Sequence, residues 1–238
     1  MATGWVRMMV RGGGLARVRL DARGPSRLFT LVSDGRVLWR PEALVIIVGN
    51  DQVEVESGLL AGEFACPACS EMVRPWGSAR RRVLRCVGGV CWRRPRRCRC
   101  AGCGRTHVLL AEDSLVRRRD ESVVIGAALV MKAAGHGHRR AAAVLGLPPS
   151  TVRGWLRRFA RNAEAIRAWF TVLAHGLDPL LGPVSPTGNT VGDAVEAVAV
   201  AARASALRLG LSLPWWFASR ASRGGLLSNT CCPWAPLV

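Results

Sequence analysis

Tyrosine is absent from the 238 residues, and lysine occurs only once, at Lys132. Without a tyrosine nucleophile, this chain is excluded from the tyrosine recombinases. Acidic residues are also scarce, since 16 stand against 34 basic ones, and the formal net charge is +18. Because nearly all of this charge is guanidinium and is clustered along the chain, it predicts a polyanionic partner. The alternative is that a GC-rich genome favours arginine codons whatever the function.

Long hydrophobic runs are missing as well. The apolar stretches at 123–134 and 191–207 are interrupted by charged residues such as Lys132 and Asp193, and each piece is too short to cross a membrane. The N-terminal segment lacks the apolar core and cleavage site of a secretory signal. We therefore expect a cytoplasmic protein with no membrane partner. Its cysteines should be metal ligands or free thiols and not disulfides.

Large aliphatic residues are thinly spread among Ala, Gly and Arg, which favours small domains over one large core. Residues 1–44, rich in Arg and Gly, are predicted to be a disordered arm or to precede the true start of translation. Residues 45–115 are predicted to form a cysteine-rich domain and residues 116–172 a helical domain. Residues 173–238 are predicted to be a linker, a short helix over about 191–207 and a poorly ordered tail.

A segment with β-sheet character opens the cysteine-rich domain. It begins VIIVGNDQVEVESGLL at Val45, which a valine start codon could make the first residue. β-Branched residues precede a turn signal at Gly49–Asp51, and apolar and polar residues then alternate through Val53 and Val55. This pattern predicts a strand or a hairpin.

Four of the nine cysteines form two C-x-x-C pairs, Cys66-Pro-Ala-Cys69 and Cys100-Ala-Gly-Cys103. The sulfurs of one such pair can reach the same ion, and two pairs complete a tetrahedron of thiolates. With strand-like segments between the pairs, the pattern predicts a zinc ribbon. The zinc would be structural, because four thiolates leave no position for a reactive water.

The cysteine cluster leaves alternatives open. The segment between the two pairs has 30 residues, whereas about 15–20 is usual. Cys86, Cys91 and Cys98 lie in this region, and Cys98 could replace Cys100. Unliganded buried thiols are the other alternative. His107 is a further candidate ligand, but four sulfurs already satisfy the ion, so we expect a surface histidine.

Arginines are dense between the two cysteine pairs, and no acid lies among them. They are Arg80, Arg81, Arg82, Arg85, Arg93, Arg94, Arg96, Arg97 and Arg99. This run predicts a surface that contacts phosphates. A solvated face without a partner is the alternative.

The segment HRRAAAVLGLPPSTVRGWLR, which begins at His138, is typical of a helix-turn-helix. Ala142 is small where two helices would cross, and Gly146 suits the left-handed residue that ends the first helix. Pro148 prevents one continuous helix, and Pro149 suits the first position of the second. An ordinary pair of helices with a solvated basic face is the alternative.

A helix over about 121–134 would complete a three-helix, homeodomain-like unit whose last helix enters the major groove by its N-terminal residues. Apolar residues recur at helical spacing at Val152, Trp155, Leu156, Phe159, Ile166 and Phe170. The predicted DNA contacts are Ser150, Thr151, Arg153, Arg157, Arg158 and Arg161, together with Arg139 and Arg140 of the helix before. Arg153 should reach base edges, whereas Arg158 and Arg161 should meet phosphates. The predicted fold class is thus α+β, with a small zinc-ribbon sheet before the helices and poorly ordered termini.

Four motifs carry a family resemblance: VGNDQVEVESGLLAGEFACPAC, CAGCGRTHVLL, GAALVMKAAGHGHRRAAAVLG and STVRGWLRRF. From Ile46 to about Phe170, roughly half of the chain, the sequence resembles an actinobacterial family in which a cysteine-knuckle domain of unknown function precedes a transposase-type helix-turn-helix. The resemblance implies a DNA-binding protein associated with an insertion element or with transposition. Residues 1–44 have no counterpart in that family, and the three cysteines between the pairs depart from its pattern.

Little of the chain remains for a catalytic domain. An RNase-H-like transposase needs three well-separated carboxylates that bind two metal ions. After the helix-turn-helix the acids are Glu164, Asp178, Asp193 and Glu196, in a short stretch of linker composition. We therefore expect a sequence-specific, non-enzymatic protein bound to double-stranded DNA, as a homodimer or beside a separate transposase subunit. The alternative is a transposase, or a fragment of one, whose catalytic part is missing or encoded separately.

Overall fold

The computed structural model describes residues 45–210 and 212–228, together with the backbone of four strands before them. These strands are β1 (Gly4–Met9), β2 (Leu15–Leu20), β3 (Thr30–Ser33) and β4 (Arg36–Val37), which pair antiparallel in chain order. The rest of the predicted arm lies outside the described residues, so its disorder and the later start stay predictions. No helix of the described part is long and apolar enough to span a membrane.

The chain divides into two compact units. We call the first, which contains residues up to 83 and 92–112, the sheet unit, and the second, which contains residues 84–91 and 113–235, the helical unit. A mixed α+β fold with a small sheet ahead of the helices is therefore confirmed.

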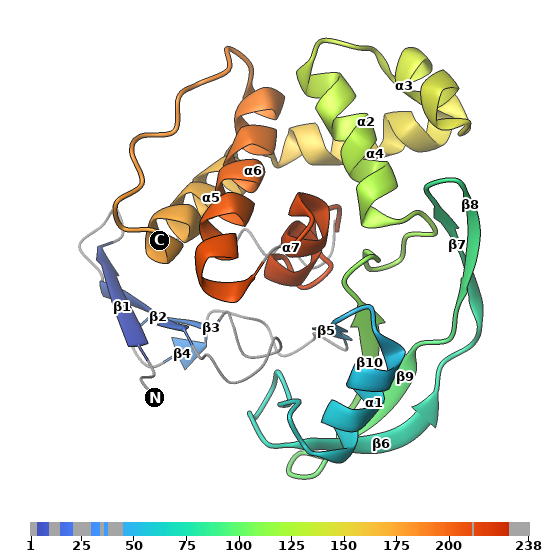
Figure 1. Cartoon of the computed structure of the whole chain (residues 1–238), viewed down its shortest axis with the longest axis vertical. Helices are drawn as coiled ribbons and strands as arrows, with labels where there is room; N and C mark the ends of the chain where they lie inside the picture. The colour runs from blue at the N-terminus through green and yellow to red at the C-terminus, as the bar shows by residue number, and fades with distance from the viewer. Residues whose placement is uncertain are drawn as a thin grey trace. The chain divides into compact units, whose positions relative to one another are not determined.

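From residue 45 on, the sheet unit contains a second four-stranded sheet and one helix (Figure 1). Its elements are β5 (Val45–Val48), α1 (Gln52–Leu60), β6 (Val73–Ser78), β9 (Arg96–Cys100) and β10 (Thr106–Ala111). The strand order is β5-β10-β9-β6; β5 runs parallel to β10, and the other neighbours are antiparallel. Helix α1 packs against β6.

Helix α1 corrects the prediction that a strand or hairpin arm follows the turn at Gly49–Asp51. The carboxylate of Asp51 accepts the backbone N–H groups of Val53 at 2.7 Å and Glu54 at 3.3 Å, and so caps the helix. This cap satisfies two N–H groups that the first helical turn leaves unpaired. In a strand Val53 and Val55 would lie on the same face. Val53 is 78% exposed and Val55 is buried, as in a helix. Asp51, three residues before Glu54, is a sequence signal for the start of a helix. The alternation of apolar and polar residues obscured this signal.

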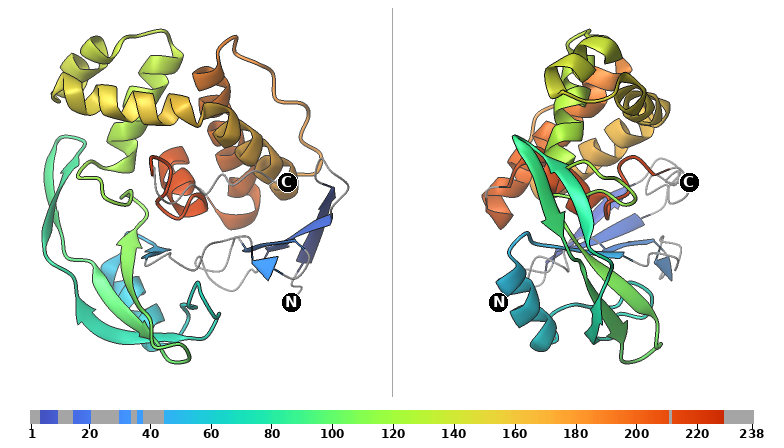
Figure 2. Two further views of the ribbon diagram at one scale, coloured as in Figure 1. Left: turned by 180° about the vertical axis from the view of Figure 1, so that it is seen from behind. Right: turned by 90° about the vertical axis from the view of Figure 1, so that its right-hand side faces the viewer.

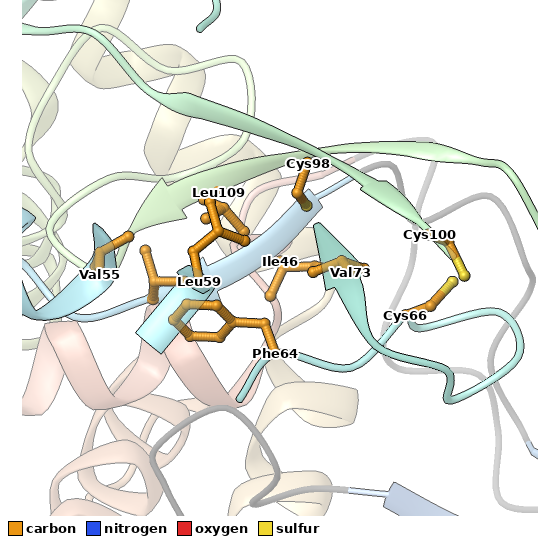
Figure 3. Packing of buried hydrophobic residues seen from close by; sticks show 10 residues of the cluster. Ile46, Val55, Leu59, Phe64, Cys66, Val73, Cys98, Cys100 and Leu109 are labelled. Carbon is orange, nitrogen blue, oxygen red and sulfur yellow. The ribbon is translucent and has the colours of Figure 1, made fainter. Parts of the chain in front are cut away.

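At β9 one face of the sheet is buried and the other faces solvent. On β9 the side chains alternate, with Cys98 and Cys100 buried and Arg97 and Arg99 exposed. The buried cluster consists of Ile46, Val48, Val55, Leu59, Phe64, Cys66, Val73, Cys98, Cys100 and Leu109 (Figure 3). A core this small stabilises a sheet only weakly without a further cross-link.

The 30-residue segment between the cysteine pairs is long because it adds a hairpin, β7 (Arg82–Cys86) and β8 (Gly89–Arg93). The end of this hairpin belongs to the helical unit, where Arg85 pairs with the buried carboxylate of Asp120 at 2.6 Å. Cys86 and Cys91 form a disulfide, so the expectation that the chain has no disulfide is wrong. The turn at Gly88, where φ is +80°, brings their Cα atoms to 6.2 Å, within the range that a disulfide can span.

Helices make up the second unit. They are α2 (Ser122–Ala133), α3 (His138–Leu145), α4 (Pro149–Arg161), α5 (Ala163–Leu177), α6 (Thr190–Leu209) and α7 (Pro214–Ala221). Helices α5 and α6 lie side by side in every view, and α7 packs against α2 and α6 (Figures 1 and 2). Ala194, Ala197 and Ala201 are fully buried on α6, because small side chains let the two helices approach closely.

The C-terminal segment is more ordered than the sequence indicated. Where an irregular tail was expected, α7 begins at Pro214, and Trp215 and Phe217 on it are buried. Leu226 and Leu227, further along, are each only 1% exposed. These apolar side chains complete the core of the helical unit and so fix the segment to residue 228. The end of the chain beyond it lies outside the described residues.

Candidate metal centre and DNA interface

Two turns of the sheet unit bring the paired cysteines together. Cys66 and Cys69 lie in the turn before β6, and Cys100 and Cys103 lie in the turn between β9 and β10. Their four sulfur atoms all lie within 4.8 Å of one another. The Sγ atoms of Cys69 and Cys100 are 3.3 Å apart, and those of Cys66 and Cys103 are 3.7 Å apart. Figure 3 shows Cys66 and Cys100 pointing toward each other at one end of the sheet.

The two turns have the same backbone form. In each, the N–H of the first cysteine donates to a carbonyl oxygen five residues further on, at 2.7 Å for Cys66 and 2.8 Å for Cys100. A backbone N–H also donates to the sulfur of each of these cysteines at 3.4 Å. The residue after the second cysteine is left-handed in both turns, with φ of 65° at Ser70 and 71° at Gly104. Glycine adopts a left-handed conformation without strain, which suits Gly104 to its place in this tight turn.

The cluster has the dimensions of a metal site. Four sulfurs about 2.3 Å from one ion lie about 3.8 Å apart in a regular tetrahedron. The Cys69–Cys100 and Cys66–Cys103 sulfur distances, at 3.3 and 3.7 Å, and the outer limit of 4.8 Å bracket this value. A set of four thiolates suits soft or borderline cations. These four cysteines could therefore hold a metal ion.

The four thiols do not ionise alike. Burial raises the pKa of Cys66 to about 12. For Cys69 the backbone N–H of Glu71 lowers the pKa, but the Cys100 sulfur and desolvation raise it, and the net shift is upward. For Cys100 desolvation raises the pKa, but the backbone N–H of Cys103 and the Cys69 sulfur bring it down to about 7. Cys100 is thus partly ionised at neutral pH and provides the first thiolate for a cation.

His107 lies beside the cluster and not on the surface, so the prediction of a surface histidine is wrong. Its side chain is 1% exposed, and its Nε2 atom lies 3.3 Å from the sulfur of Cys66. The alternation of β10 places it on the buried face, across from Cys98 on β9. An imidazole N–H at this distance can donate to a metal-bound thiolate and hold its orientation.

Cys98 is not part of the cluster. It is completely buried among apolar side chains, and burial raises its pKa to about 11 (Figure 3). The four grouped sulfurs include Cys100, so the alternative in which Cys98 replaces that ligand is not the arrangement in the structure. Cys86 and Cys91 are joined to each other and are likewise outside the group.

Helices α2, α3 and α4 form the helix-turn-helix. Helix α3 ends at Gly146, which is left-handed with φ of 63°, and the N–H of the next residue returns to the carbonyl oxygen of Ala142 at 3.0 Å. Ala142 is 1% exposed, as a close helix crossing requires. Helix α4 begins with Pro149. On α4, Val152 and Phe159 are fully buried, with Trp155 between them.

The opposite face of α4 carries most of the predicted DNA contacts. Ser150, Arg153, Arg157 and Arg161 follow one another at spacings of three and four residues, and all four are exposed. Such a spacing places them along one side of the helix. Thr151 is half-buried at the edge of this side. On α3, Arg139 and Arg140 are also exposed.

Arg158 differs from the other predicted contacts. It is half-buried, and its guanidinium donates to the carbonyl oxygen of Gly154 on its own helix at 3.0 Å. It also lies near Arg118, whose pKa is lowered by burial and then by the charge of Arg158. Its position between the exposed face and the core makes it a weaker candidate for phosphate contact than Arg161.

Comparison with known protein families agrees with this geometry. Residues 124–170 match the family described as homeodomain-like domain, and the matched residues run from α2 through α4 into α5. Neither a search of curated proteins nor a search of solved structures gave a match. The homeodomain-like helix-turn-helix is therefore shown for this part of the chain, and it supports DNA as a partner.

Proposed function

We propose that this chain is a non-catalytic protein that binds double-stranded DNA in a sequence-specific manner and is associated with an insertion element. The observation that carries the proposal is the row of exposed residues Ser150, Arg153, Arg157 and Arg161 on α4, within a homeodomain-like match. In this type of unit the helix that follows the turn lies in the major groove. An arginine in its first turns can pair with the O6 and N7 atoms of guanine.

The cysteine cluster supports a structural role for a metal, which we propose is zinc. The donor set is four thiolates, and such a closed shell offers no coordination position to water or substrate. The cluster lies at one end of a buried core of only ten residues, so the ion would supply stability that apolar burial does not. Cys66, Cys69, Cys100 and Cys103 would hold it, and the N–H of His107 would support the Cys66 sulfur.

The test is a comparison of two arginines on α4. Binding sites are selected from a random DNA pool, and the affinity for the selected duplex is measured over a range of salt concentrations. Arg153→Ala should weaken binding to the preferred site by roughly 1–3 kcal/mol and relax discrimination at one or two base pairs. Arg161→Ala should weaken binding to all duplexes alike and reduce the salt slope by about one unit.

Arg203→Ala is the matched control, because Arg203 is an exposed arginine on α6 that is paired with Glu196. It removes the same charge from another helix and should leave the site preference unchanged. If no sequence is enriched and the three variants lose affinity equally, the basic helix binds DNA without sequence preference and the proposed specificity is wrong.

A further inference from the structure

The solvent-facing side of the sheet unit is both basic and aromatic. Direct pairing places Arg74 of β6 opposite Arg99 of β9, and Arg97 lies two residues from Arg99 on the same side. All three side chains are exposed. The opposite side of β9 contributes Cys98 and Cys100 to the buried core. At β6 and β9, one side of the sheet therefore contributes to the core, and the other presents cations to solvent.

A bulge adds an indole ring to this exposed side. The register of β6 shifts between Pro75 and Gly77, so Trp76 is the extra residue of the bulge. Bulges commonly redirect a side chain at the edge of a sheet. Trp76 is 54% exposed, and the guanidinium carbon of Arg99 lies 4.9 Å from the centre of its ring. The indole thus lies among the cations and leaves about half of its surface to solvent.

A second guanidinium–indole pair lies in the same unit. The guanidinium carbon of Arg81 is 4.4 Å from the ring centre of Trp92, and Trp92 is 55% exposed. Exposed indole rings that are each backed by a guanidinium can stack on a planar ligand, so the two pairs point to a binding role. Each pair combines a flat apolar surface with a positive charge.

The charge on this side of the sheet is not neutralised by neighbouring acids. Strands β6, β9 and β10 contain no Asp or Glu. Arg96, which belongs to the other side of β9, forms an ion pair with Glu56 of α1. Among the described residues no comparable ion pair is present for Arg74, Arg97 or Arg99. Arg99 donates to the carbonyl oxygen of Gly104 at 3.1 Å, which leaves its charge unneutralised. The arginine that lies toward the helix thus has an acid partner, and the positive charge of the solvent-facing arginines can attract an external anion.

We propose that this face, defined by Arg74, Trp76, Arg97 and Arg99, binds single-stranded DNA by stacking an unpaired base on Trp76. Proteins that bind single strands use a basic surface for the phosphates and aromatic rings for the bases. In a duplex each base is stacked between its neighbours, so an exposed indole has a partner only where the strand is unpaired. The choice of DNA over RNA rests on the proposed function of the helix-turn-helix.

The full chain is titrated with a fluorescently labelled oligothymidylate, and binding is followed by anisotropy at several salt concentrations. Trp76→Leu should lower the affinity about 5- to 100-fold with an unchanged salt slope, whereas Trp76→Phe should retain most of it. Arg97→Ala should reduce the salt slope by about 0.7, the value for one phosphate contact on a single strand. Val53→Ala, which trims an exposed apolar residue of α1, is the matched control and should change nothing.

The same variants are titrated with the selected duplex, which separates this proposal from the proposed function. Trp76→Leu should leave duplex affinity intact, and Arg153→Ala should leave oligothymidylate affinity intact. Equal affinity of Trp76→Leu and wild-type protein for the oligothymidylate would overturn the inference. Tighter binding of oligouridylate than of oligothymidylate would also overturn it, as would a loss of oligothymidylate binding in Arg153→Ala. A duplex that competes for the bound oligothymidylate as effectively as an unlabelled single strand does would overturn it too. Thermal unfolding of each variant shows that the fold is retained.

Discussion

Each thiol of the cluster must lose its proton before it binds a cation. The pKa of Cys66 is raised to about 12 and that of Cys69 is raised as well, so both are thiols at neutral pH. Cys100, with a pKa of about 7, is about half ionised there. Protons and metal therefore compete, and acid favours release of the metal.

This competition predicts how zinc affinity depends on pH. Near neutral pH, binding should release at least two protons, from Cys66 and Cys69, so the logarithm of the association constant should rise by at least two per pH unit. Below the pKa of Cys100 the slope should become steeper, because a third proton must leave. Calorimetric titration in buffers of different ionisation enthalpy measures the proton release.

Cys98→Ala is the control for this titration, because it removes a buried thiol that lies outside the cluster. Its proton release should equal that of the wild-type protein. A release of one proton or fewer at neutral pH in the wild type would contradict the prediction, since it would mean that the metal-free cluster is already ionised.

Single residues of both sites could be predicted from the sequence when short-range spacing determines them. The C-x-x-C pairs and the Gly146 turn depend on local geometry, and the structure has both. His107 was misplaced because its burial follows from the pairing of β10 with β9, which depends on residues distant in sequence. Arg158 stays a predicted contact, but its bond to the carbonyl oxygen of Gly154 could not be predicted, because a long side chain can return to its own helix.

Among the helices, α2 and α7 meet at a glycine. A Cβ atom added to Gly126 of α2 would lie 2.2 Å from the indole of Trp215 on α7. The ring is rigid and buried, so it cannot move aside as the end of a flexible chain would. The glycine is therefore required for the contact, although it lowers the intrinsic stability of α2.

Gly126→Ala should accordingly destabilise the protein by up to about 2 kcal/mol, because overpacking that costs about 1–3 kcal/mol exceeds the gain in helix propensity of about 1 kcal/mol. Gly176→Ala on α5 is the matched control, since a Cβ there meets nothing within 4 Å. It should stabilise the protein by about 0.5–1 kcal/mol. Urea denaturation followed by circular dichroism measures both. Equal effects of the two substitutions would show that α7 does not pack on Gly126.

A helix could be predicted from the sequence when it is long enough to show a clear amphipathic period. Helices α2, α3 and α4 follow their apolar spacing, but α4 ends at Arg161 where the apolar stripe runs on to Phe170. Asn162, with φ of −108° and ψ of 9°, separates α4 from α5. Helix α7 has eight residues, too few for a clear period, and its Trp215 is buried in packing against helices that are distant in sequence, among them α2.

For the molecule as a whole, the metal should stabilise one unit and not the other. The sheet unit has a small core that includes two of the four sulfurs, at Cys66 and Cys100, whereas the helical unit has an extensive core of its own. Structural zinc contributes about 10–16 kcal/mol to the folding of small domains, which exceeds the stability of most of them.

Chelation, or Cys66→Ser with Cys103→Ser, should therefore abolish metal binding and unfold the sheet unit while the helical signal in circular dichroism persists. Scanning calorimetry should then lose one of two transitions. Cys86→Ser with Cys91→Ser is the control, because it removes the disulfide outside the cluster and should retain about one zinc per chain. Retention of zinc in the Cys66/Cys103 variant would assign the ion to other ligands.

Within the part of the chain that the structure describes from residue 45 on, the chain passes from one unit to the other three times, near residues 83, 91 and 112. A single break in the gene cannot separate the two units, because a fragment that starts at residue 113 leaves behind the hairpin residue Arg85 and strips Asp120 of its counter-ion. Recombination would have to exchange both units together or neither. The exposed basic face of α4 and the basic, aromatic face of the sheet unit are therefore expected to be inherited together. Related proteins should have both faces or neither.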